Sequence, residues 1–320
     1  MKKTSASLFS VTSCLLTLPL LFSSQVSANS LTQGDVQTSL SFGFLSGKAK
    51  EFVFDDSYKL SELNWTIKNA PIVNAEFNYD ITPRFSLNAR GWTTIMGGNG
   101  FNNDWDWEDI NDNNFTSHSW GKTNLNYANE IDLSARAWFL QTDRYQAGVL
   151  AGYQKSRFSW NMRGGKYNYR GELDDNDNYI AYPEPDTGEF DNSKLSLGYK
   201  QSFSAPYIGL TGLWRKDDVE FGALVKFSPW VQSKDNDEHY LRDATFRNKG
   251  NDAKMVSARV YAGYDITPQI KLLTEASYTR YSFTRADTQI FDEEGVENHP
   301  GGGGLSNQSW MVQAGLQYRF

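Results

Sequence analysis

Cysteine, histidine and long apolar runs are all scarce in this chain. Its 320 residues include one cysteine and three histidines, while 39% are hydrophobic and 15% are aromatic. After the N-terminal segment, no stretch approaches the roughly 20 consecutive apolar residues that a membrane-spanning helix needs. The single cysteine, Cys14, lies in a segment predicted to be removed. Disulfide bonds and a cysteine nucleophile are therefore excluded from the mature protein.

Residues 1–28 are predicted to be a secretory signal peptide. A positively charged start is followed by the apolar stretch Cys14–Phe22, and small residues stand at Val26 and Ala28 in the spacing of a cleavage site. Cleavage after Ala28 leaves residues 29–320 as a single domain. Removal of the two lysines of the signal takes the formal net charge from −7 to −9. This acidic balance makes nucleic acid a poor partner and favours cationic partners.

The remaining composition is typical of a transmembrane β-barrel, in which a polar interior, a lipid-facing exterior and aromatic girdles coexist. Three segments alternate apolar and polar residues with period two: 131–139 (IDLSARAWF), 219–227 (VEFGALVKF) and 256–264 (VSARVYAGY). A water-soluble sandwich also alternates. Charges on the inner faces of several strands, however, favour a wet lumen over a packed core.

Turn signals predict the number of strands. The sequence YDITP occurs at 79–83 and again at 264–268, and short polar turns stand at 141–145 and 215–219. Five longer polar segments alternate with these four turns, which predicts an all-β, ten-stranded antiparallel transmembrane β-barrel with long extracellular loops. The terminal strand, which ends on Phe320, resembles the assembly signal of bacterial outer-membrane barrels. The longer segments lie near 55–60, 97–124, 164–192, 234–254 and 286–308.

Two pairs of polar residues in different long segments are candidates for chemistry. Asp104 and Asp106 are spaced i, i+2, as are Asp237 and His239. In extended backbone each pair points to one side. A neutral histidine can accept a proton from water, and a neighbouring carboxylate can orient it. Two facing carboxylates would raise one another's pKa, which suits acid–base work.

Other interpretations of these segments remain open on the residues alone. Loops rich in Asp and Asn are commonly only solvated. A Ca²⁺ site suits their oxygens, although the EF-hand spacing is missing, and Zn²⁺ could use His239. The sequence contains no GxSxG and no HExxH, so serine hydrolases and zincins have no support. His118 and His299 are interpreted as surface residues, and no metal site is predicted.

Seven motifs in order along the chain resemble the omptin family of outer-membrane endopeptidases. The resemblance covers essentially all of residues 29–320, and DNDEHY carries the Asp–His pair that is catalytic in the family. The motifs are LSGKAKE (45–51), GWTT (91–94), LNYANE (125–130), GYQKSR (152–157), RGGKY (163–167), PYIGLTG (206–212) and DNDEHY (235–240).

The resemblance implies an aspartic-type endopeptidase with a groove at the outer mouth of its barrel. His239 with Asp237 would act as general base, and Asp104 with Asp106 would form the opposing couple. Water between the pairs would attack the peptide carbonyl without a covalent intermediate. The family cleaves beside basic residues, often between two.

Glu51 and Asp235 match the acids of the family's specificity pocket. Strand parity places Glu51 on the lumen side. The same parity carried past Val231 would turn Asp237 and His239 outward, unless Pro229 marks a bulge that resets the register.

Lipopolysaccharide is the second partner that the resemblance implies. Tyr153 and Arg157 match the family's lipid-contacting wall, whereas Lys155, Ser202 and Asn251 depart from it. Lipopolysaccharide is expected to be needed for activity, and no cofactor is expected.

The chain is expected to depend on the outer-membrane assembly machinery and to face the cell exterior with its active site. Thr116 stands where the family often has another acid, and Gly301–Gly304 are expected to form an adaptable rim. A non-catalytic pore or adhesin and a lipid-modifying barrel enzyme are the alternatives.

Overall fold

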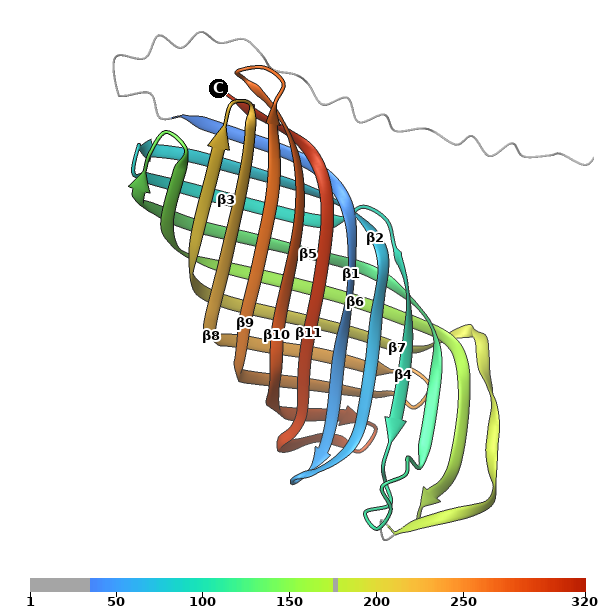
Figure 1. Ribbon diagram of the computed structural model, residues 1–320. Coiled ribbons are helices and arrows are strands. Elements are labelled where there is room, and N and C mark those ends of the chain that lie inside the picture. The colour runs from blue at the N-terminus through green and yellow to red at the C-terminus, as the bar shows by residue number, and fades with distance from the viewer. Residues whose placement is uncertain (1–34, 175–177) are drawn as a thin grey trace, which may run out of the picture. The chain divides into compact units, whose positions relative to one another are not determined.

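The computed structural model describes residues 35–174 and 178–320, and nearly all of them lie in β-strands (Figure 1). Within these residues, no helix is long and apolar enough to cross a membrane. The predicted signal peptide lies outside the described residues. The strands are β1 (Val36–Asp55), β2 (Tyr58–Thr82), β3 (Phe85–Thr94), β4 (Gly98–Asp106), β5 (Ser117–Gln141), β6 (Tyr145–Leu173), β7 (Tyr179–Lys216), β8 (Val219–His239), β9 (Ala244–Asp265), β10 (Ile270–Asp292) and β11 (Gly295–Arg319).

The strands form one antiparallel sheet that closes on itself. Apart from β3 and β4, each strand pairs with its neighbours in the chain, and β1 pairs with β11 from Gln37↔Arg319 to Val53↔Gly303. β3 and β4 both pair with β2 and with β5, one after the other along the same line. They therefore fill a single position in the ring, interrupted at 95–97. The predicted ten-stranded antiparallel barrel is confirmed.

The long polar segments are mostly paired strands, not irregular loops. β10 and β11, for example, continue to a tight turn between Asp292 and Gly295. Backbone N–H and C=O groups of a strand bond to those of its antiparallel partners even where both faces of the sheet meet water. A polar segment can therefore be a strand, and the polar composition alone predicted too many loop residues.

The four glycines at 301–304 lie within β11. A Cβ at Gly303 would lie 2.0 Å from Asn248 Oδ1, and one at Gly304 would lie 2.6 Å from Phe283 Cε2. Gly303 and Gly304 therefore permit close packing, and the four glycines lie in a strand where a rim loop was expected.

Apolar side chains form an exposed band around the barrel, which we call the apolar belt. On β5, Ile131, Leu133 and Phe139 are 54–69% exposed, whereas Asp132 between them is 3% exposed. Each such side chain left in water loses about 1.5–3 kcal/mol of hydrophobic stabilisation. The belt therefore requires an apolar surrounding. Its members include Leu40, Phe42, Phe44, Leu133, Val149, Leu210, Phe221, Val225, Val256, Val260, Leu272, Trp310, Val312 and Leu316.

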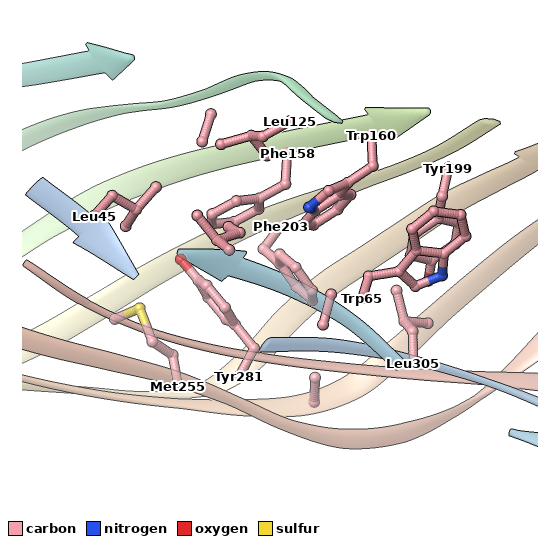
Figure 2. Close-up of a cluster of buried hydrophobic side chains, with 14 of the residues drawn as sticks. Leu45, Trp65, Leu125, Phe158, Trp160, Tyr199, Phe203, Met255, Tyr281 and Leu305 are labelled. Atoms are coloured by element: carbon pink, nitrogen blue, oxygen red, sulfur yellow. The ribbon is translucent and has the colours of Figure 1, made fainter. Parts of the chain in front are cut away.

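A cluster of buried side chains, many of them aromatic, lies inside the barrel (Figure 2). Trp65 stacks on Tyr199 with ring centroids 5.1 Å apart, and Trp160 lies 6.2 Å from Trp65. The rings of Phe203 and Tyr281 stack at 4.1 Å. Because these rings come from β2, β6, β7 and β10, they join opposite walls of the barrel. A lumen filled in this way argues against an open pore.

Candidate active site

Asp104 and Asp106 lie on β4, on the face that points into the barrel. Ser61 of β2 donates a hydrogen bond to Asp104 Oδ1 at 3.2 Å, and Ser117 of β5 donates to Asp106 Oδ2. The expected shared direction of the two aspartates follows from their spacing in a strand. The neighbours on either side in the sheet therefore fix both carboxylates.

Asp237 and His239 lie at the end of β8. His239 Nε2 is 2.6 Å from Asp237 Oδ2. The Asp237 residue is 2% exposed, and its Oδ1 has no partner among the described residues. The ring of Phe246, on β9, contacts the His239 ring edge to face at 5.2 Å. The imidazole is thus held by a carboxylate and by an aromatic ring.

A register shift in β8 turns this pair inward. Even-numbered residues point inward up to Ser228, and odd-numbered residues do so from Val231 onward. Pairing with β9 shifts between these two residues, on either side of Pro229 and Trp230. The bulge expected at Pro229 is confirmed.

The two pairs act on one another electrostatically. Burial, and then the charges of Asp106 and Asp237, hold the pKa of Asp104 well above its usual range. Burial also raises the pKa of Asp106, although hydrogen bonds from serines and the nearby Arg242 and His239 oppose this effect. Residues separated by more than 130 positions are therefore brought into one acidic site.

Glu51 and Asp235 form an acidic pocket beside the two pairs. Burial, followed by the charges of Asp237 and Asp235, raises the pKa of Glu51, which is 1% exposed. Burial also raises the pKa of Asp235 to about 7. The parity prediction for Glu51 is confirmed. A cavity of about 220 Å³ opens next to Glu51, whose Oε2 has no partner among the described residues. A buried carboxylate without a partner beside a cavity suits a cationic side chain.

Several neighbours of the site were not found by sequence reasoning. Tyr199 donates to Asp235 Oδ2 at 3.1 Å, and the backbone N–H of Asn248 donates to its Oδ1 at 3.2 Å. Burial, together with the charges of Asp104 and Asp106, raises the pKa of Tyr169 to about 12. These contacts depend on which strands pair, and no spacing along the chain reveals them.

Thr116 closes the loop behind Asp106. It donates to the Asp106 carbonyl oxygen at 3.1 Å and accepts from the Glu108 N–H at 3.0 Å. This places Glu108 near Asp106, and burial and the charge of Asp106 raise the pKa of Glu108. Glu108 is thus a further acid near Asp106, just beyond the end of β4.

His299 is exposed, as expected of a surface residue, whereas His118 is half-buried. His118 stacks between Trp105 and Trp120, with centroids 4.9 and 4.5 Å away. His299 lies 3.0 Å from Glu297 Oε2 and lines the same cavity as Glu51. The i, i+2 spacing of Glu297 and His299, identical to that of Asp237 and His239, was a signal that could have identified this pair.

The proposed lipid-contacting residues lie on the outer wall of β6. Tyr153 is 46% exposed, and Arg157 is exposed with its Nε donating to Asn129 Oδ1 at 3.0 Å. Lys155 shares their face. Within residues 35–174 and 178–320, no group of His, Cys, Asp and Glu side chains has the arrangement of a metal site.

The apolar belt and the acidic site beyond it define the class of protein: a transmembrane β-barrel with a candidate active site at one mouth. The Omptin family model matches residues 32–320, and the chain belongs to the omptin family.

Curated relatives and a solved structure agree with this assignment. The plasminogen activator of Yersinia pestis is 43% identical over 286 residues, covering 88% of each chain. Protease 7 of Escherichia coli K12 is 39% identical over 318 residues, covering 96% of this chain and 98% of the relative. The crystal structure of the outer-membrane protease OmpT from Escherichia coli superposes with a TM-score of 0.85 at 37% identity, covering 92% of this chain and 99% of that chain. The protein is therefore an outer-membrane β-barrel of a protease family.

Proposed function

We propose that the chain is an aspartic-type endopeptidase that cleaves peptide bonds next to basic residues, preferably between two. The observation that carries this proposal is the contact of 2.6 Å between His239 Nε2 and Asp237 Oδ2, in a site that also holds Asp104 and Asp106. A water molecule between the two pairs is the proposed nucleophile.

In this mechanism His239 accepts a proton from the water as it attacks the scissile carbonyl carbon. Asp237 stabilises the imidazolium that forms. The raised pKa of Asp104 favours a protonated carboxyl, which can donate a hydrogen bond to the developing oxyanion. His239 then returns its proton to the leaving amine. No covalent bond to the enzyme forms in this scheme.

Specificity is assigned to Glu51 and Asp235. A lysine or arginine side chain of the substrate would enter the cavity beside Glu51 and neutralise its buried carboxylate. Charge-assisted hydrogen bonds of this kind contribute roughly twice as much as neutral ones. An apolar side chain would leave the acids unpaired, which costs free energy.

The proposal also includes where the enzyme acts and what it binds in the membrane. The active site faces the cell exterior, lipopolysaccharide binds at Tyr153 and Arg157, and the outer-membrane assembly machinery inserts the barrel. Exposure of both side chains on the β6 wall supports the lipid contact. Lipopolysaccharide is proposed to be needed for activity.

The test uses the mature protein refolded with lipopolysaccharide. We expect cleavage of a quenched peptide containing Arg-Arg, no cleavage of its Ala-Ala counterpart, and at least a thousandfold loss of kcat in His239→Ala, because the general base is removed. Barrel integrity is checked by the heat-dependent shift on electrophoresis. Wild-type cleavage by folded His239→Ala would refute the mechanism, and cleavage of both peptides would refute the specificity.

A further inference from the structure

A second group of cations lies on the outer wall formed by β10, β11, β1 and β2, which are neighbours in Figure 1. Lys48, Lys68 and Arg280, named here the β1 basic patch, all point away from the lumen. Arg280 and Lys48 pair with Gln308 of β11 from its two sides. Lys68 lies two residues from Thr66, which pairs with Lys48. Two cations thus flank one neutral amide, and the third lies on the next strand of the same wall.

The three side chains of the patch form no ion pair within the described residues. Across residues 35–174 and 178–320, none of the ion pairs or side-chain hydrogen bonds involves these three cations. The nearby acid Glu62 already binds Lys50 Nζ at 2.6 Å and Lys59 Nζ at 3.0 Å. The positive charge of the patch therefore remains available to an external anion.

The apolar belt begins directly beside the patch. Phe44, Tyr278 and Trp310 are 58%, 39% and 46% exposed on the same wall. Tyr278 OH donates to Gln308 Oε1 at 3.5 Å, so the aromatic edge of the belt contacts the centre of the patch. An anion bound at the patch would have an apolar surface next to it. This combination fits an amphiphile with an anionic head group and acyl chains.

We propose that the β1 basic patch binds the phosphate groups of an outer-leaflet glycolipid whose acyl chains lie along the apolar belt. Lys48 and Arg280 are two strand intervals apart, about 10 Å, and their long side chains can converge over Gln308. Arginine binds phosphate bidentately and lysine as a point charge. The inference rests on the proposed outer-membrane setting and is independent of proteolysis.

The patch lies opposite the proposed Tyr153–Arg157 wall. In a ring of ten strand positions, β6 and β11 are five positions apart in either direction. Bound lipid would therefore hold the barrel on two opposite walls. Loss of one site should leave the other occupied.

The experiment counts lipids on the refolded mature barrel by native mass spectrometry, using diphosphoryl lipid A and dephosphorylated lipid A. We expect the double variant Lys48→Gln/Arg280→Gln to retain one fewer diphosphoryl lipid A than the wild type. Arg84→Gln/Lys216→Gln, which removes the same charge from exposed short turns at the other end, should retain the wild-type number. Arg157→Gln should lose a different lipid, so its effect should add to that of the double variant.

Three results would overturn the inference. The first is equal retention by the wild type and the Lys48→Gln/Arg280→Gln variant, both verified as folded by electrophoresis. The second is equal retention of dephosphorylated lipid A. The third is displacement of the lipid by millimolar inorganic phosphate, which would assign the patch to free anions. Because lipid counting needs no substrate, an inactive protease would leave this test unchanged.

Discussion

At the scale of single residues, the position of one imidazole determines the proposed chemistry. Asp237 Oδ2 fixes the Nε2 edge of His239, and the Phe246 ring contacts it edge to face. Phe246 also lines the cavity next to Glu51. One aromatic side chain therefore separates the proposed base from the pocket for the basic residue.

Phe246 is expected to act as a positioning residue. In Phe246→Leu the edge contact with His239 is lost, and kcat on the dibasic peptide should fall about tenfold, which corresponds to about 1.4 kcal/mol and lies within the range of aromatic contacts. Phe246→Tyr retains the ring and should restore most of kcat. Steady-state kinetics separates kcat from KM. An unchanged kcat in Phe246→Leu would contradict a positioning role.

Asp235 is expected to make substrate binding depend on pH. With its pKa raised to about 7, Asp235 is mostly neutral at pH 6 and mostly charged at pH 8. The KM for an arginine peptide should therefore fall as pH rises through 7. In Asp235→Asn this dependence should flatten, which a KM series from pH 6 to 8 measures. The same slope in wild type and Asp235→Asn would assign it to another group.

At the scale of elements, β8 points its even-numbered residues inward in its first part and its odd-numbered residues inward in its last part. The shift between Ser228 and Val231 keeps Phe221 and Val225 facing outward and still turns Asp237 inward. A single-residue slip exchanges the two faces of a strand. One bulge thus connects the apolar belt with the inward-facing Asp237–His239 pair, which is proposed to be catalytic.

Deletion of Trp230 is expected to make the bulge unnecessary, because Ser228 and Val231 would then be two residues apart, as their partners Met255 and Ala253 are on β9. Regular alternation would keep both residues inward, so Asp237 and His239 should still point inward and cleavage should be largely kept, while the belt part of β8 remains in place. Activity and the electrophoretic shift measure the two effects separately. Deletion of Gly295 in the exposed β10–β11 turn is the matched control, and activity there should be largely kept. A drop in cleavage to the level of His239→Ala, in a folded barrel lacking Trp230, would refute the parity argument.

Strands could be predicted from the sequence where the alternation of apolar and polar residues alone identified them. Alternation in 131–139 and 219–227 identified strands because one face meets lipid and the other meets a polar lumen. The polar segments were assigned to loops because composition carries no record of backbone pairing. The break between Thr94 and Gly98 was likewise not predicted. The spacing of Asp104 and Asp106 identified the pair, whereas Ser61, Ser117 and Tyr199 reach the site only through strand pairing.

At the scale of the whole molecule, the buried acids couple folding to pH. Glu51, Asp104, Asp106 and Asp235 all have raised pKa values. The folded barrel therefore holds protons that the unfolded chain releases at a lower pH. Stability must then fall as pH rises from the unfolded pKa near 4 through the folded values. The site is held together at the expense of stability near neutral pH, as expected of acids gathered for function.

Thermal unfolding in detergent should consequently begin at a higher temperature at pH 5 than at pH 8. Each pKa unit is worth roughly 1.4 kcal/mol, so Glu51→Gln/Asp235→Asn should be more stable than wild type at pH 8 and nearly equal to it at pH 5. Circular dichroism measures both. The reverse order, with the wild type more stable at pH 8, would show that these acids are paired as anions in the folded state.

The pairing of β1 with β11 completes the proposed substrate pocket. Glu51 is on β1, and its backbone partner on one side is Leu305 of β11, a strand far downstream in the chain. The proposed pocket is therefore incomplete until the two ends of the chain meet. A chain in transit to the membrane carries every residue of the site without the site itself. If the chain acts as proposed, ring closure would delay proteolysis until the barrel is assembled.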